Sequence, residues 1–268
     1  MLTEIGARTD VGCVRELNED NFRVVPELSL LVLSDGMGGA AHGEVASQMA
    51  VDTVVEHCQK GMEDRSLSFE GEQRTDLSYK TNRLASAVRL ANRVIREAAS
   101  NDPEFRGMGA TIVAVWLDGD KLSLAHVGDS RAYRLRAGTL EVLTRDHSLV
   151  AEQVRLGLLT QEQADVSEYQ TILIRALGAT EVVEVDVDEH LLLHGDSVLL
   201  CSDGLSRMIS DDVIAGTIVN SDQVQGTTDR LIDLAREAGG LDNITAILLR
   251  IKARPQSLLD RIFPQRNR

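Results

Sequence analysis

The chain has 268 residues, of which 43% are hydrophobic, 26% are charged and only 3% are aromatic, and its formal net charge is −14. This composition predicts a globular protein of one large domain or two small ones, and the acidic balance argues against a nucleic-acid partner, because phosphate backbones attract basic surfaces. There is no run of about 18 apolar residues and no signal-peptide pattern at the start, so we expect a cytoplasmic protein without a membrane span.

The three cysteines, Cys13, Cys58 and Cys201, are far apart in the sequence and form no CxxC pair. Their odd number and their spacing predict neither a disulfide nor a zinc site, as is typical of a reducing compartment. We expect them to be buried apolar side chains rather than nucleophiles.

Alternating and helical hydrophobic patterns predict the elements of the first hundred residues. In chain order these are strands at 20–25 and 28–33, within a strand-like segment at 1–35, a helix at 43–60, a surface loop at 61–80 and a helix at 81–100. The second helix has a well-defined apolar stripe, and the sequence Asn101-Asp102-Pro103 ends it.

The rest of the chain reads as many hairpins followed by consecutive helices. In chain order we predict strands at 110–117, 121–127, 131–136 and 139–143, short helices with loop at 147–180, strands at 182–187 and 197–201, helices at 211–219 and 223–237, and a strand at 243–251. Strict βαβ alternation is absent, which argues against a doubly wound parallel sheet. Stacked antiparallel sheets, covered outside by helix pairs, fit better.

Two apolar runs end in Ser-Asp-Gly, at 34–36 and at 202–204. A buried strand that stops at a carboxylate aims it outward, so two such ends in one core can place Asp35 and Asp203 side by side. Like charges held that close need a counter-charge, which divalent metal usually supplies. Gly36 could also turn its backbone carbonyl toward such a ligand, since no side chain is in the way.

Three more aspartates occupy predicted strand ends: Asp129 follows a strand, and Asp20 and Asp242 each open one. For any one of them, ordinary turn chemistry accounts for the residue. Five aspartates at strand ends, with no cysteine or histidine cluster competing, favour an oxygen-ligand site for Mg²⁺ or Mn²⁺. Arg15 lies five residues before Asp20, and its planar fork could clamp phosphate oxygens, although spacing alone equally fits a surface arginine.

Taken in order, the motifs resemble the metal-dependent protein serine/threonine phosphatases of the protein phosphatase 2C type, in their bacterial form. The matching stretches are 9–12, Arg15, 18–20, 34–39, 43–47, 109–111, 125–131, 144–148, 175–178, 202–205 and 242–245. The resemblance implies an α+β fold: a four-layer αββα sandwich of two antiparallel β-sheets flanked by helix pairs. It also implies one phosphatase domain at 1–251, with a flap at 147–180, followed by a basic tail at 252–268.

The resemblance further implies a centre of two Mn²⁺ or Mg²⁺ ions, with a third ion in many bacterial members. Asp35 would bridge the two core ions and Gly36 would give its carbonyl to one of them. The remaining ligands would be Asp203 and Asp242 on the first ion, Asp20 on the second, and Asp129 with Asp203 on the third.

The implied reaction is hydrolysis of phosphoserine and phosphothreonine in proteins, by in-line attack of a water or hydroxide that bridges the metals. Asp35 would be catalytic through this bridge, and Arg15 would bind the substrate phosphate. The implied partners are phosphorylated proteins, with Ser/Thr kinases or their substrates among them in signal transduction, and we expect a monomer.

The identity of the general acid stays open. Relatives carry a histidine at the positions of Met37 or Ala40, and this chain has His42 two residues further on, which could donate a proton or be a solvated loop residue. We expect His126 to be structural and His147 to position the flap, and a metal-held water could also protonate the leaving oxygen.

The flap also departs from the family pattern, with Ser167-Glu168-Tyr169-Gln170 where a His-Pro pair is common, and this should alter substrate choice more than chemistry. The absent histidines leave open a catalytically weak pseudophosphatase that binds metal and regulates a phosphoprotein or kinase. A phosphatase for a small phosphorylated metabolite is a third hypothesis.

Overall fold

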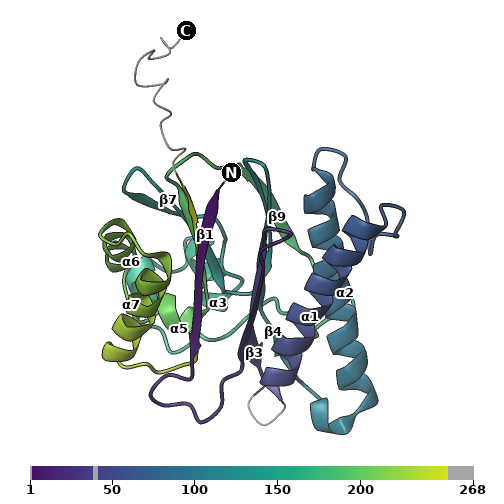
Figure 1. Cartoon of the computed structure of the whole chain (residues 1–268). Coiled ribbons are helices and arrows are strands. Elements are labelled where there is room, and N and C mark those ends of the chain that lie inside the picture. Colours follow the sequence, from purple (N-terminus) through teal and green to yellow (C-terminus); the bar gives the residue numbers. More distant parts are fainter. Residues whose placement is uncertain (1, 39–41, 253–268) are drawn as a thin grey trace, which may run out of the picture.

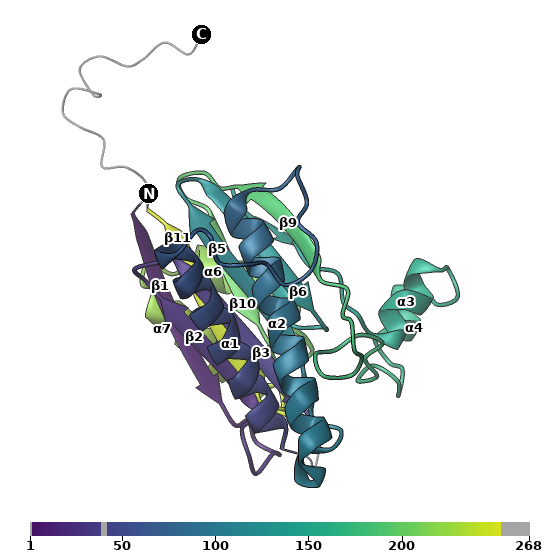
Figure 2. The same ribbon diagram turned by 90° about the vertical axis from the view of Figure 1, so that its right-hand side faces the viewer.

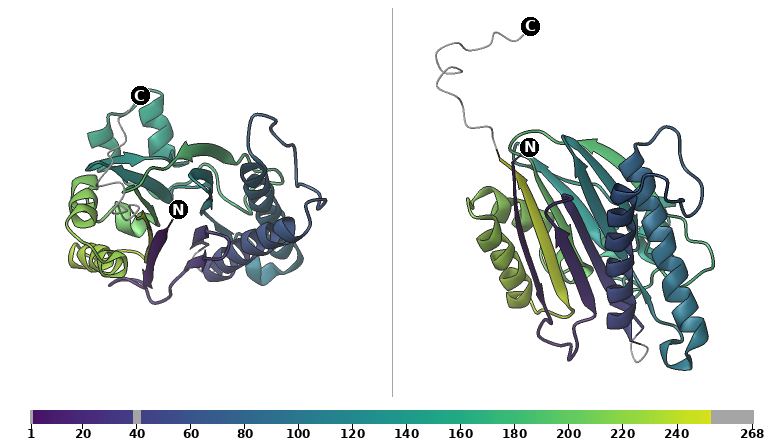
Figure 3. Two further views of the ribbon diagram at one scale, coloured as in Figure 1. Left: turned by 45° about the horizontal axis from the view of Figure 1, so that its top comes forward. Right: turned by 45° about the vertical axis from the view of Figure 1, so that its right-hand side comes forward.

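The computed structural model describes residues 2–38 and 42–252, and its elements form four layers. Two antiparallel sheets face each other at the centre (Figure 1). The first helix pair, α1 (Gly43–Glu63) and α2 (Tyr79–Asn101), covers one outer face, and the second, α6 (Asp211–Val219) and α7 (Val224–Glu237), covers the other, as both views of Figure 3 show. The predicted αββα sandwich is confirmed.

The strands of the two sheets come from distant parts of the sequence. The first sheet runs in the order β1 (Thr3–Asp10), β11 (Ile244–Ile251), β10 (Ser197–Cys201), β7 (Arg131–Arg136) and β8 (Thr139–Val142). The second runs β2 (Asp20–Val25), β3 (Leu30–Met37), β5 (Ile112–Asp118), β6 (Lys121–Val127) and β9 (Asp186–Leu191), with the short β4 (Gly109–Ala110) beside β3.

The central strands are apolar without interruption because both of their faces are buried. Successive side chains of a strand point to opposite faces. In β3, Leu31 and Leu33 therefore pack between the sheets, while Leu30 and Val32 pack under the first helix pair. This explains why the strand reads as one apolar run rather than as an alternation.

Several predicted boundaries differ from the structure. β3 does not stop before Ser34 but continues to Met37, because β4 pairs with its last residues. β9 begins at Asp186 rather than at 182, since Val183 and Val185 are buried against the first helix pair outside the ladder. In the first helix pair, α1 runs three residues past 60, and α2 begins at Tyr79 after the capping residue Ser78.

One strand lies where only a strand-like segment was predicted, one helix was missed, and one side chain was wrongly predicted. β1 pairs along its whole length with β11, and the one-turn helix α5 (Asp203–Ser206) follows β10 where we expected only a strand end. Cys58 and Cys201 are buried free thiols as expected, but Cys13 is exposed, so the prediction that it is buried was wrong.

Residues 147–180 form short helices and loop, as predicted. They contain α3 (Leu149–Arg155) and α4 (Gln161–Ala164), which stand out from one edge of the sandwich in Figure 2. The basic tail expected at 252–268 lies, apart from Lys252, outside the described residues. None of the helices within 2–38 and 42–252 is long and apolar enough to cross a membrane.

Candidate metal centre

At one end of the sandwich the inner face changes from apolar to acidic. The alternation that places Leu31 and Leu33 between the sheets also places Asp35 there, two residues further along β3. Asp20 is the antiparallel register partner of Asp35, so both carboxylates belong to the same face of the second sheet. Asp35 therefore lies inside a strand, not beyond its end as the sequence suggested.

The first sheet supplies its aspartates from two neighbouring strands. Asp203 is the first residue of α5, directly after β10, and Asp242 comes just before β11. The two sheets are joined here by hydrogen bonds: the hydroxyls of Ser202 and Thr245 donate to Asp20 Oδ2 over 2.7 and 2.6 Å. The aspartates of both sheets thus gather at one point.

A cleft of about 180 Å³ opens at this point. Its lining includes all but one of the predicted site residues, and Asp20, which is 4% exposed, lies out of the lining beside Asp35. The lining residues are Arg15, Glu19, Asp35, Gly36, Met37, Gly38, Thr111, Asp129, Thr171, Leu173, Asp203 and Asp242. Thr171 and Leu173 belong to the segment predicted as a flap, which therefore borders the cleft.

The carboxylates are crowded and poorly solvated. Burial raises the pKa of Asp20 to about 7 and likewise raises the pKa of Asp129 to about 7. The pKa of Asp35 is raised well above its ordinary value, by burial first and then by the charges of Asp20, Asp203 and Asp129. Burial also raises the pKa of Asp203. A cluster that resists ionisation in this way favours a bound cation.

Two arginines neutralise part of the negative charge of these carboxylates. Arg15 Nη2 lies 2.8 Å from Asp242 Oδ2 at the rim, and Arg207 contacts both Asp129 and Asp203. Two buried oxygens still have no hydrogen-bond partner within the described residues, Asp20 Oδ1 and Asp203 Oδ1. Buried carboxylate oxygens without a partner are costly, and a divalent ion with oxygen ligands would satisfy them, so the donors present fit Mg²⁺ or Mn²⁺.

Sequence reasoning missed the parts that four residues play in supporting the site. Arg207 could have been suspected from its position four residues after Asp203, a spacing at which helical side chains meet. Ser202 and Thr245 lie inside the recognised motifs, but nothing in the sequence shows that both reach Asp20. Asn243 holds the loop that carries Arg15, because its amide donates to the carbonyls of Val11 and Leu17 over 3.0 and 2.8 Å.

The histidines near the motifs stand apart from the cleft. His42 occupies the N-cap position of α1, and its imidazole lies 3.1 Å from Glu44 and 3.3 Å from Glu104. It does not belong to the lining of the cleft. Met37 does line the cleft, while Ala40 lies outside the described residues. A hydrogen bond to Glu44 raises the pKa of His42, which makes it a surface ion-pair residue in this geometry.

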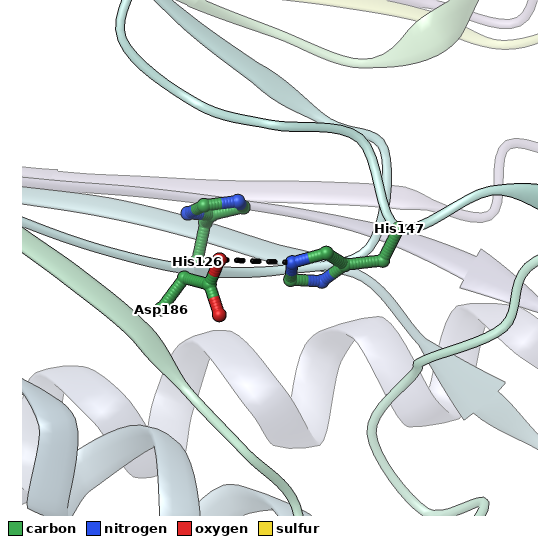
Figure 4. A group of neighbouring side chains, drawn as sticks. All are labelled: His126, His147 and Asp186. Carbon is green, nitrogen blue, oxygen red and sulfur yellow. Dashed lines mark ion pairs between the residues drawn. The ribbon is translucent and has the colours of Figure 1, made fainter. Parts of the chain in front are cut away.

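A second group with metal-ligand chemistry lies outside the cleft. His126, His147 and Asp186 offer ligand atoms within 4.8 Å of one another, and Figure 4 shows His147 facing Asp186. The two imidazoles stack with centroids 4.8 Å apart, and His147 Nδ1 accepts from the amide of Gly128. Arg175 Nη1 lies 3.0 Å from His147 Nε2 and also pairs with Asp186, so a cation already fills this position.

This histidine network supports the strand end that carries Asp129. Burial, followed by the charges of His126 and Arg175, lowers the pKa of His147 to about 4, so its imidazole is neutral near pH 7. A neutral ring with an acceptor Nδ1 can hold the Gly128 amide directly before Asp129. The contacts thus make His126 and His147 part of a structural network, and a role of His147 in positioning the flap stays a prediction.

Position 36 requires a glycine because the backbones of Gly43 and Glu19 lie too close to it for a side chain. A Cβ there would collide with the carbonyl oxygen of Gly43 and lie 2.7 Å from that of Glu19. We expect Gly36→Ala to lower the free energy of unfolding by about 1–3 kcal/mol. Gly216→Ala in α6 is the matched control, because nothing lies within 4 Å of its Cβ, and it should raise stability by up to about 1 kcal/mol. Urea unfolding measures both, and equal stabilities would contradict the packing argument.

Comparison with known proteins shows that most of this chain is similar to the proteins of one family. The sequence model of the family described as "Protein phosphatase 2C" matches residues 14–248. The serine/threonine protein phosphatase PstP of Mycobacterium tuberculosis is 38% identical over 248 residues, which are 92% of this chain and 45% of that protein. The serine/threonine phosphatase stp of Listeria welshimeri is 36% identical over 245 residues, 90% of this chain and 93% of that protein.

A solved structure shares both sequence and fold. The catalytic domain of PstP in complex with two manganese ions is 36% identical, with a TM-score of 0.78, and the match covers 94% of this chain and 99% of that one. The chain therefore spans about half the length of the mycobacterial protein and nearly all of its catalytic domain.

Proposed function

The chain belongs to the protein phosphatase 2C family, and from that membership we propose that it is a metal-dependent protein serine/threonine phosphatase. The observation that carries the proposal is the acidic cleft, where aspartates of both sheets gather and two of their buried oxygens have no hydrogen-bond partner in the described part of the chain. Such a site fits divalent ions and, through them, a phosphate ester. The pseudophosphatase alternative gains no support from the comparisons, since the matched relatives are named as phosphatases.

The proposal assigns the metals to two groups of residues. Asp35 would contact both core ions and Gly36 would give its carbonyl to one of them. Asp203 and Asp242 would hold the first ion, and Asp20 the second. The ions would be Mn²⁺ or Mg²⁺, and the PstP catalytic domain was solved in complex with two manganese ions. When bound, such ions supply a water of lowered pKa and offset the negative charge of phosphate oxygens.

Arg15 would bind the substrate phosphate. Its guanidinium is held at the rim by Asp242 and remains 48% exposed, so it is open to an incoming anion. The planar fork of arginine matches two phosphate oxygens at once, and such charge-assisted bonds orient the ester for in-line attack. Asn243 keeps this arginine in place through the loop that it anchors.

The proposed substrates and partners are phosphoserine and phosphothreonine proteins, with Ser/Thr kinases or their substrates among them. The segment at 147–180 would act as the flap beside the active site, because its Thr171 and Leu173 line the cleft. The proposal also includes a monomeric state and a location in the cytoplasm. The three free cysteines are typical of that reducing compartment.

Phosphate release from a phosphothreonine peptide tests this function. We expect turnover with Mn²⁺ that EDTA abolishes, and a loss of at least about a hundredfold in Asp242→Asn, the order seen when one transition-state contact is removed. Asp212→Asn is the matched control, because Asp212 is an exposed aspartate at the start of α6.

Two outcomes would favour the other hypotheses. Tight, metal-dependent binding of the phosphopeptide without phosphate release would support a pseudophosphatase. Faster release from small phosphate esters than from the phosphopeptide would support a metabolite phosphatase.

A further inference from the structure

Arg207 lies between the two carboxylates that the family resemblance assigns to a third metal ion. Its Nη2 is 2.8 Å from Asp129 Oδ2, and its Nη1 is 2.8 Å from Asp203 Oδ2. The carboxylates are 7% and 13% exposed and the arginine 24%, so little water reaches the pairs. A fixed guanidinium thus bridges Asp129 and Asp203 with one nitrogen for each.

A third ion and this guanidinium exclude each other. Both would occupy the space between the carboxylates of Asp129 and Asp203, and arginine keeps its charge at any pH at which a protein folds. To admit the ion, the arginine would have to give up two charge-assisted bonds in a poorly solvated place and then remain beside a like charge. The residues of this position therefore do not fit a third ion, whereas those of the two core ions do.

The same arginine also holds the flap. Arg207 Nη2 donates to the backbone carbonyl of Gln170 over 3.0 Å, and Gln170 belongs to the segment whose Thr171 lines the acidic cleft. Arg207 further lines a neighbouring cleft of about 700 Å³ between this segment and α5, so its side chain stands between the two clefts. Three separate parts of the chain, the end of β6, α5 and the flap, meet at this side chain.

We propose that Arg207 takes the place of a third metal ion, so that the protein binds two divalent ions and the arginine fixes the flap beside them. The proposal rests on the proposed function for its two core ions. It makes Arg207 a positioning residue, with the charge of the ion supplied by a side chain that cannot dissociate. Occupancy of this position would then be independent of the metal concentration.

The number of bound Mn²⁺ ions tests the proposal, by calorimetric titration and by elemental analysis after gel filtration. We expect two ions per wild-type chain and three in Arg207→Gln, with the count returning to two in Arg207→Gln combined with Asp129→Asn. Arg155→Gln, on the exposed surface of α3, is the matched control and should keep two. Arg207→Lys retains the charge, should also keep two, and still tests the proposal where Arg207→Gln is unstable.

Each count has a distinct meaning. Three ions in the wild type, or two in a folded Arg207→Gln, would overturn the proposal while leaving the phosphatase centre intact. Fewer than two ions in the wild type would instead overturn the core metal assignment. Hydrogen exchange over residues 165–175 should be about tenfold faster in Arg207→Gln than in the Arg155 control, and unchanged exchange would overturn the flap contact.

Discussion

Asp35→Asn is expected to abolish Mn²⁺-dependent phosphate release and, in the same protein, to raise the melting temperature of the metal-free form. Activity should fall by at least about a hundredfold, because this residue is proposed to contact both core ions. Stability should change in the opposite direction, because Asp35 is buried among aspartates whose charges raise its pKa. Removing one of these groups relieves repulsion that no ion offsets.

The size of the stability change can be estimated from the size of the protein. A gain of 1 kcal/mol corresponds to roughly 2–4 °C in a chain of this length, and we expect at least that much in EDTA. Asp212→Asn again serves as the control and should leave activity and melting temperature unchanged. Persistent activity in Asp35→Asn would contradict its assignment, and a lower melting temperature without metal would contradict the electrostatic argument.

As the pH falls from 8 to 6, the stabilisation that Mn²⁺ gives should shrink by about 3 °C in melting temperature, the effect of linking one proton over one pH unit. The pKa of Asp20, a proposed ligand of a core ion, is about 7 in the metal-free native state and near 4 in the unfolded chain. Between these values the native state binds protons that the unfolded state lacks, so the metal-free protein loses stability as the pH rises through 7. Bound metal requires ionised ligands and therefore gains from the same rise.

The difference between Mn²⁺ and EDTA samples isolates this effect from other titrations. Burial also lowers the pKa of His126 and His147, so protonation of these residues in the unfolded state favours unfolding below pH 6.5. That term is common to both samples and cancels in their difference. Paired thermal melts at pH 6, 7 and 8 provide the measurement, and a stabilisation by Mn²⁺ that stays constant or grows toward pH 6 would contradict the linkage.

The layered fold and the identities of the acidic residues could be predicted because they depend on local signals. Apolar runs such as the one around Leu31 indicate strands buried on both faces, and the order of the motifs indicates the family. Where Asp35 lies was harder to see, since β3 continues past Leu33 by pairing with the start of β2 and, at its last residues, with β4, more than 70 residues later. Such a boundary depends on a partner strand, which periodicity within the strand does not reveal.

The supporting residues of the site could not be predicted from the sequence for the same reason. Ser202 and Thr245 belong to the first sheet and bind Asp20 of the second, so their part appears only once the sheets are stacked. The bond from Arg207 to the carbonyl of Gln170 likewise joins segments whose approach is set by the flap. Long-range contacts of this kind are formed by tertiary structure and leave no pattern in the sequence.

Nearly the whole chain must be synthesised before the acidic cleft can form. Asp20 is made early, but its partner Thr245 follows 225 residues later, on the strand that inserts between β1 and β10. Until β11 takes that place, β1 and β10 are not joined, and neither the carboxylate of Asp242 nor the hydrogen bond from Thr245 to Asp20 is present. An unfinished chain would therefore lack the complete acidic cleft.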